Sequence, residues 1–141
     1  MKLTPQVDSF YKGYIKIISF FNKMAEKSDT LELSELSFDE LNLNENLLRG
    51  IYSYGFEKPS MIQHKAIPVV TSGKDVIAQA QSGTGKTGAF SIGSLNRVDE
   101  TLKESQILIL SPTRELAEQT FTVMKELSTY TNISIVKVVG G

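Results

Sequence analysis

A glycine-rich loop near the middle of the chain constrains the fold more than any other feature. Residues 80–87 read Ala-Gln-Ser-Gly-Thr-Gly-Lys-Thr and stand between an apolar run at 76–78 and a helix-like segment. Glycines allow backbone N–H groups to turn toward a phosphate at a helix N-terminus, where the helix dipole already favours an anion. We therefore expect a site for a triphosphate, with a flexible loop that carries a chance lysine as the alternative.

Two side chains at the end of this loop are suited to complete the site. Lys86 adds a positive charge that can reach the β- and γ-phosphates, and the Thr87 hydroxyl is placed to coordinate Mg²⁺. The loop follows the general P-loop pattern except at Ala80, where the strict pattern has Gly. Lys86 and Thr87 are therefore the candidate catalytic residues, and Thr87 is the candidate metal ligand.

The composition is typical of a single globular domain. The 141 residues are 40% hydrophobic and 22% charged, and the net charge is −1. A charge so near zero gives no general attraction to nucleic acid, so any polyanion must be held by a local site. The absence of cysteine excludes a thiol nucleophile, a disulfide and a zinc–thiolate site. The apolar stretches near the N-terminus are too short to span a membrane, so we expect no membrane partner.

The charge balance changes sign close to Met24. Before it, four lysines stand against one aspartate, whereas residues 24–48 hold seven acidic residues and one lysine. This change of charge suggests that Met24 is the natural start of the protein. We interpret residues 1–23 as an unassigned extension, 24–37 as an acidic flexible segment and 38–141 as the folded part.

Hydrophobic periodicity from residue 43 onward predicts an α/β fold. Apolar side chains recur at helical spacing in four segments, and three other segments are short, apolar and typical of buried strands. Such an order predicts a parallel sheet covered by helices, with ligands at the carboxyl ends of its strands. The loop at 80–87 and the turn at 111–113 should then open onto one side. The predicted helices are 43–54, closed by Gly55, 60–68, bent or stopped near Pro68, 86–98 and 113–130; the predicted strands are 75–80, 106–111 and 133–139.

The segment at 55–63 has two interpretations from its residues alone. Ser60 followed by Gln63 is a capping box, and Lys58-Pro59 ends one helix before the next begins. Alternatively, the Gln63 amide offers both a donor and an acceptor, which N7 and the N6 amine of adenine require together. Phe56 would supply an aromatic surface beside the base.

Four segments in order resemble motifs of the DEAD-box RNA helicases. They are the Q motif at 55–63, motif I at 80–87, motif Ia at 112–117 and the GG element at 140–141. The resemblance covers 38–141 and implies a RecA-like P-loop NTPase domain in an ATP-dependent RNA helicase that unwinds or remodels RNA. The sequences of residues 46–52 and 75–82 are similar to those of the translation initiation factor 4A branch. Branches of the exon-junction and nucleolar rRNA-processing type are nearly as similar.

The resemblance implies ATP and Mg²⁺ as cofactors and assigns residues to them. Gln63 and the backbone carbonyl of Lys58 would recognise adenine, while Phe38 or Phe56 would pack against the base. The phosphates and Mg²⁺ would be held by Ser82, Gly83, Thr84, Gly85, Lys86 and Thr87.

The same resemblance implies that one RNA strand is a partner, contacted along its backbone by Pro112, Thr113, Arg114 and Gly141. Such binding depends on salt and is indifferent to base sequence. For Arg114 the alternative is an ordinary helix-start residue that pairs with Glu118 one turn later. The initiation-factor branch further implies a translation initiation scaffold protein as a partner and a cytoplasmic location, whereas the other two branches imply a nuclear one.

The 141 residues contain no Asp-Glu-Ala-Asp or equivalent Walker-B segment and no Ser-Ala-Thr motif. Hydrolysis needs a carboxylate that holds Mg²⁺ and an arginine that neutralises the transition state. We therefore expect an N-terminal helicase fragment, truncated before the Walker-B strand, that binds ATP weakly and shows neither turnover nor duplex unwinding. Two other classes compete with this interpretation. They are a different P-loop enzyme, such as a small-molecule kinase, and a non-catalytic nucleotide-binding module.

Overall fold

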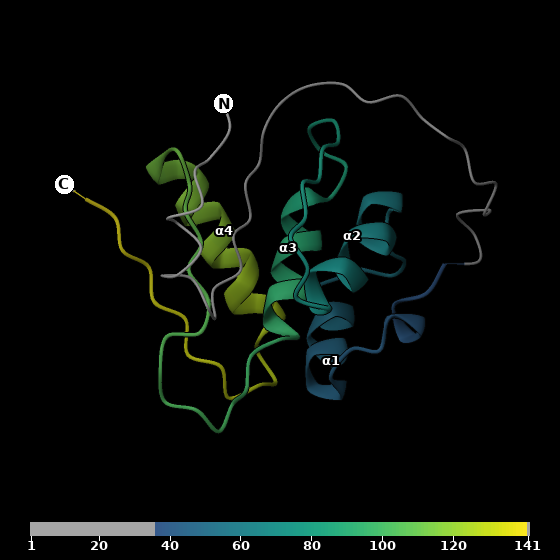
Figure 1. The fold of residues 1–141 in the computed structure, drawn as a ribbon, viewed down its shortest axis with the longest axis horizontal. Helices are drawn as coiled ribbons and strands as arrows, with labels where there is room; N and C mark the ends of the chain where they lie inside the picture. Colours follow the sequence, from purple (N-terminus) through teal and green to yellow (C-terminus); the bar gives the residue numbers. More distant parts are fainter. Residues whose placement is uncertain (1–35, 141) are drawn as a thin grey trace.

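Four α-helices and one short 3-10 helix form the regular structure of residues 36–140, the part of the chain that the computed structural model describes. Figure 1 draws α3 between α2 and α4, with α1 below them. The predicted extension, nearly all of the acidic segment and Gly141 lie outside the described residues. The elements are η3 (Phe38–Leu41), α1 (Glu45–Ser53), α2 (Met61–Thr71), α3 (Lys86–Leu95) and α4 (Arg114–Leu127).

Three of the four α-helices begin at a side chain that caps them. The Asn44 side chain accepts hydrogen bonds from the N–H groups of Asn46 and Leu47 at 2.9 and 3.4 Å. Thr113 does the same for Leu116 at the start of α4, at 3.2 Å. Each cap satisfies a helix-end donor that has no partner within the helix. All four predicted helices are confirmed, with ends that differ from the prediction by at most three residues.

The chain after α1 turns as the sequence predicts, but the end of α2 does not. Gly55 adopts a φ of 99°, in the region that favours glycine, directly after the C-cap of α1. Of the two outcomes predicted near Pro68, a bend or a stop, the stop is wrong, because α2 continues to Thr71. A proline inside a helix removes its own N–H bond and its ring crowds the carbonyl four residues earlier, so continuing the helix through it is costly. Ala66, Ile67 and Val70 remain buried in α2, and their packing offsets that loss.

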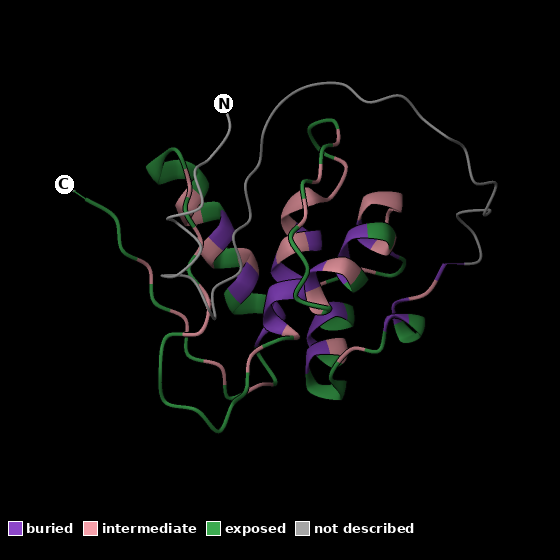
Figure 2. Ribbon diagram, in the orientation of Figure 1, coloured by how far each residue is buried: buried purple, intermediate pink, exposed green. Residues whose placement is uncertain are grey.

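The hydrophobic core lies where the helices meet around α3. Helix α3 contacts α1, α2 and α4, and α2 also contacts η3. Figure 2 shows this concentration of buried residues in α3 and on the facing sides of its neighbours. The core cluster consists of Phe38, Leu41, Leu47, Ile51, Ile67, Ile92, Leu95, Met124 and Leu127.

The predicted strands are the main point on which sequence and structure differ. Within residues 36–140 the segments 75–80, 106–111 and 133–139 carry no hydrogen-bonded strand, apart from an isolated bridge at Val76. The parallel sheet is therefore not confirmed. An apolar run indicates which residues are favoured to be buried. A strand also requires a neighbouring strand, in register, that hydrogen-bonds to its backbone.

These segments nevertheless alternate in burial along the chain. Ile109, Ile133 and Ile135 pack against the core cluster. The residues beside them point away, and exposed fractions reach 82% at Leu110 and 91% at Val138. The prediction that both faces of these runs are buried is thus wrong for the described residues, because only the face toward the helices is covered.

A buried serine in α3 provides a test of the core. Ser91 is fully buried and its hydroxyl has no hydrogen-bond partner. We expect Ser91→Ala to raise the free energy of unfolding by about 1 kcal/mol, because it removes an unsatisfied polar group. Urea denaturation measures the change. Ser72→Ala is the matched control, since that hydroxyl is exposed and donates to the Val69 carbonyl at 2.8 Å. A loss of stability in Ser91→Ala would contradict the assignment of the Ser91 hydroxyl as unsatisfied.

Candidate nucleotide and RNA site

The N-terminus of α3 differs from those of the other three α-helices that the structure describes. Its N-cap is Gly85, with a φ of 96°, and no side chain caps it. Gly83, two residues earlier, also has a positive φ, of 81°. Both angles lie in the region that L side chains rarely adopt, so the loop needs glycine at these positions. The first N–H groups of α3 are therefore left for an external acceptor such as a phosphate.

Lys86 lies over the loop that precedes it. Its ammonium group donates to the carbonyl of Ala80 and, at 2.7 Å, to that of Gln81. The Thr84 hydroxyl donates to the same Gln81 carbonyl at 2.7 Å. The Lys86 ammonium group is thus hydrogen-bonded to neutral carbonyls of the loop. A phosphate bound at the loop could replace these carbonyls as its partner. Thr87, next along α3, is half-buried.

Gln63 links the segment at 55–63 to this loop. Its Oε1 accepts from the Ser60 N–H at 2.9 Å, and the Ser60 hydroxyl accepts from the Gln63 N–H at 3.4 Å. The capping box is therefore confirmed. The Nε2 of Gln63 also donates to the Gly85 carbonyl at 3.2 Å, and the residue is only 3% exposed. One acceptor position on Oε1 and one donor on Nε2 remain unused by these bonds.

Aromatic rings lie beside this amide. Phe56 is half-buried and stacks on Phe38, with ring centroids 6.2 Å apart and planes inclined by 21°. Tyr54 meets the Phe56 ring edge-on at 4.7 Å. Phe38 itself is fully buried in the core. Of the two candidate base contacts, only Phe56 therefore has exposed surface in this structure. The buried Phe38 ring packs against it.

Gly88 is a site residue that the sequence analysis missed. A Cβ at this position would lie 2.6 Å from Nε2 of Gln63 and 3.2 Å from the Phe56 ring. The first turn of α3 can approach both side chains only because Gly88 has none. Its one signal in the sequence is a glycine directly after Lys86-Thr87, inside a predicted helix, where glycine is unfavourable.

The remaining candidates of the nucleotide site are less enclosed. Ser82 and Gly83 are exposed in the loop, and Thr84 and Gly85 are half-buried. Lys58 is exposed on the chain between α1 and α2, next to the buried Pro59. No group of three or more His, Asp or Glu side chains that could hold a metal ion occurs in residues 36–140.

Two of the candidate RNA-binding segments meet in the structure. Pro112, Thr113 and Arg114 are exposed at the start of α4, and the Arg114 guanidinium donates to the Gly140 carbonyl. The alternative pairing of Arg114 with Glu118 is wrong, because Glu118 instead forms an ion pair with Lys137. Figure 1 draws the loop before α3 and the start of α4 at the same, upper end of the helices.

Among the described residues, none of the helices has the length and apolar character that a membrane span requires.

Comparison with known families separates the helicase interpretation from that of a different P-loop enzyme. Residues 60–141 match the family described as DEAD/DEAH box helicase. The chain belongs to this family. The match includes Gln63, the loop at 80–87 and motif Ia, so the helicase interpretation is favoured over a small-molecule kinase.

Curated DEAD-box relatives are similar over most of the chain. The ATP-dependent RNA helicase FAL1 of Saccharomyces cerevisiae is 58% identical over 105 residues, which is 74% of this chain and 26% of that protein. Eukaryotic initiation factor 4A of Caenorhabditis elegans is 56% identical over the same lengths. The chain therefore spans about a quarter of the curated relatives that it matches. The two identities are too close to assign it to one branch.

Solved structures of DEAD-box proteins share the fold. Dbp5 of S. cerevisiae bound to RNA and ADP BeF3 superposes with a TM-score of 0.65 and 48% identity, over 69% of this chain and 25% of that one. A DEAD box protein from Methanococcus jannaschii gives a TM-score of 0.59 and 43% identity, over 64% of this chain and 25% of that one. The RecA-like helicase relationship of the fold is thus supported by structure as well as by sequence.

Proposed function

We propose that this chain supplies the nucleotide-binding part of an ATP-dependent RNA helicase. The observation that carries the proposal is the uncapped N-terminus of α3 behind a glycine loop, joined through Gln63 to the segment at 55–63. A helix end without a side-chain cap suits a phosphate, and an amide fixed beside it suits a base. The family membership and the ATP-dependent helicase names of the relatives agree with this combination.

In this proposal the phosphates of ATP bind at the loop. Backbone N–H groups of Ser82 to Thr87 would donate to the phosphate oxygens, and Lys86 would exchange its two loop carbonyls for the β- and γ-phosphates. Thr87 would contribute its hydroxyl to Mg²⁺, which would neutralise the phosphate charge. Hydrolysis also requires a carboxylate that holds Mg²⁺, and the 141 residues hold no Asp-Glu-Ala-Asp segment that would supply it.

Adenine selectivity would come from Gln63. Its Oε1 would accept from the N6 amine while Nε2 donates to N7, and Phe56 would cover the face of the base. The Lys58 carbonyl would accept a second bond from N6. The bond from Nε2 to the Gly85 carbonyl fixes the amide relative to the phosphate loop, so base and phosphate recognition would be coupled.

RNA would be bound through its backbone by the junction of motif Ia and the GG element. Thr113, Arg114 and Pro112 are exposed there, and Gly141 would allow a sugar–phosphate chain to approach closely. We further propose that the runs at 75–80, 106–111 and 133–139 pair as parallel strands in the whole domain, which would place these loops at one edge.

The cellular role that we propose depends on the branch. An initiation-factor role would imply translation initiation, a scaffold protein as a partner and a cytoplasmic location. An exon-junction or rRNA-processing role would imply a nuclear one. The similar identities to FAL1 and initiation factor 4A support both to the same degree.

Competition binding with a fluorescent adenine nucleotide tests the adenine assignment. We expect Mg·ATP to displace the probe at concentrations about tenfold lower than Mg·GTP, and Gln63→Ala to remove this preference, because two hydrogen bonds to the base are lost. The matched control is Ser60→Ala, which breaks the same capping box but leaves the amide in place. Equal displacement by ATP and GTP in the unmodified chain would contradict the proposal.

A further inference from the structure

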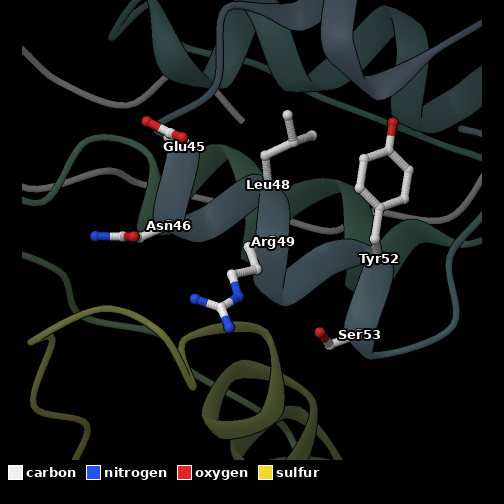
Figure 3. A pocket seen from close by; sticks show the side chains of 6 residues that line it. All are labelled: Glu45, Asn46, Leu48, Arg49, Tyr52 and Ser53. Carbon is white, nitrogen blue, oxygen red and sulfur yellow. The ribbon is translucent and has the colours of Figure 1, made fainter.

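The outer face of α1 forms a shallow hollow that no motif of the nucleotide or RNA site uses. Its volume is about 620 Å³. Figure 3 shows Leu48 and Tyr52 on one flank of the helix, with Arg49 and Ser53 on the other. The hollow is lined by Glu45, Asn46, Leu48, Arg49, Tyr52 and Ser53.

Arg49 is held in place by an aromatic ring and not by an acid. The central carbon of its guanidinium lies 4.0 Å from the centroid of the Tyr130 ring. The Ser53 hydroxyl donates to the Tyr130 hydroxyl at 3.3 Å, which ties the ring to α1. Among residues 36–140, Arg49 takes part in no ion pair. Stacking covers a face of the guanidinium and leaves the N–H donors in its plane available to a carboxylate.

The acids near this cation are engaged elsewhere or too far to neutralise it. Asp39 accepts hydrogen bonds from Tyr52 and, at 2.7 Å, from Ser37. These bonds lower the pKa of Asp39, and the bond to Asp39 raises the pKa of Tyr52. Glu45 lines the hollow one turn before Arg49 but lies beyond ion-pair distance of it. The hollow therefore combines one free cation with acidic surroundings.

We propose that this hollow docks a protein segment that presents one carboxylate beside an aliphatic side chain. Arg49 would bind the carboxylate through paired N–H donors, while Leu48 and the Tyr52 ring, 40% exposed, would contact the aliphatic group. A nucleic acid fits less well than a segment with a single carboxylate, because Glu45 in the lining and Asp39 beside Tyr52 would repel the further phosphates of its chain. This surface is separate from the ATP and RNA sites and does not depend on the proposed function.

A pair of short peptides that differ only in charge tests the docking site. The probes are acetyl-Leu-Glu-Leu-amide and acetyl-Leu-Gln-Leu-amide, added to the 141-residue chain while the Arg49 side-chain N–H and Tyr130 ring signals are followed by NMR. We expect the glutamate peptide to shift both signals along a saturable curve and the glutamine peptide to bind roughly tenfold more weakly, because it lacks the charge-assisted bond.

Variants and a competitor complete the test. Arg49→Gln should abolish the difference between the peptides, whereas Arg97→Gln, at an exposed arginine whose guanidinium lies beside Gly73 and does not line the hollow, should leave it unchanged. Tyr130→Phe should retain binding, since the ring remains. Equal shifts with both peptides, or a response that survives Arg49→Gln, would overturn the proposal. So would a short uridine oligonucleotide that displaces the glutamate peptide, because the hollow would then be a phosphate site.

Discussion

Lys86→Ala is expected to weaken binding of Mg·ATP by roughly 10- to 100-fold. The ammonium group is the positive charge of the loop at 80–87, and two backbone carbonyls already hold it over the place where phosphates would bind. A hydrogen bond to a charged group contributes about 1.5 to 3 kcal/mol, which corresponds to this range in affinity. Titration calorimetry of the chain with Mg·ATP measures the effect directly.

Lys103→Ala is the matched control for this experiment. It removes the same charge from an exposed position between α3 and α4, so affinity for ATP should change little. The helical content of both variants should match that of the unmodified chain by circular dichroism. The phosphate-site assignment fails if a folded Lys86→Ala variant binds Mg·ATP as tightly as the original.

The second large effect is expected at Gly50, where α1 crosses α4. A Cβ on Gly50 would lie 1.9 Å from the carbonyl oxygen of Leu127 and 2.9 Å from its carbonyl carbon. These are backbone atoms and cannot rotate away, so Gly50→Ala must push the two helices apart and open the core around Ile51 and Leu127, both fully buried. We expect a loss of about 3 kcal/mol or more in the free energy of unfolding, measured by urea denaturation.

Gly140→Ala controls for the chemistry of this substitution. Apart from Gly140 itself and its two chain neighbours, no atom lies within 4 Å of the position where its Cβ would stand, and stability should change by less than about 0.5 kcal/mol. A Gly50→Ala variant with unchanged stability would mean that α1 and α4 do not approach as closely as the structure has them.

Local sequence rules predicted the helices well because their signals are local. Asn44, Ser60 and Thr113 precede the helices that they cap, and each cap bonds to a backbone group within three residues. The strand prediction used hydrophobic runs, which report burial and not pairing. Ile109 and Ile135 do face the core, but Leu110 and Val138 do not, and no ladder forms within the described residues.

The site shows the same division. The glycines at 83 and 85, Lys86 and Gln63 were all identifiable from spacing, because a phosphate loop and a capping box are short-range patterns. The roles of Phe38 and Arg114 required long-range packing. Phe38 is sealed behind Phe56, and Arg114 bonds to Gly140 instead of to Glu118. The need for glycine at position 88 is evident only from its close approach to two side chains of the segment at 55–63.

By itself, the sequence determined the positions of the four helices, the glycine loop and the order of motifs that places the chain among the DEAD/DEAH box helicases. Tertiary structure alone decided that Gln63 joins the segment at 55–63 to the loop at 80–87, that Gly50 and Gly88 are contact points between elements, and that Arg49 stacks on Tyr130 without an ion pair among the described residues. The physical reason is range. Caps, turns and periodicity arise between neighbours in the chain, whereas these contacts join residues that only folding brings together.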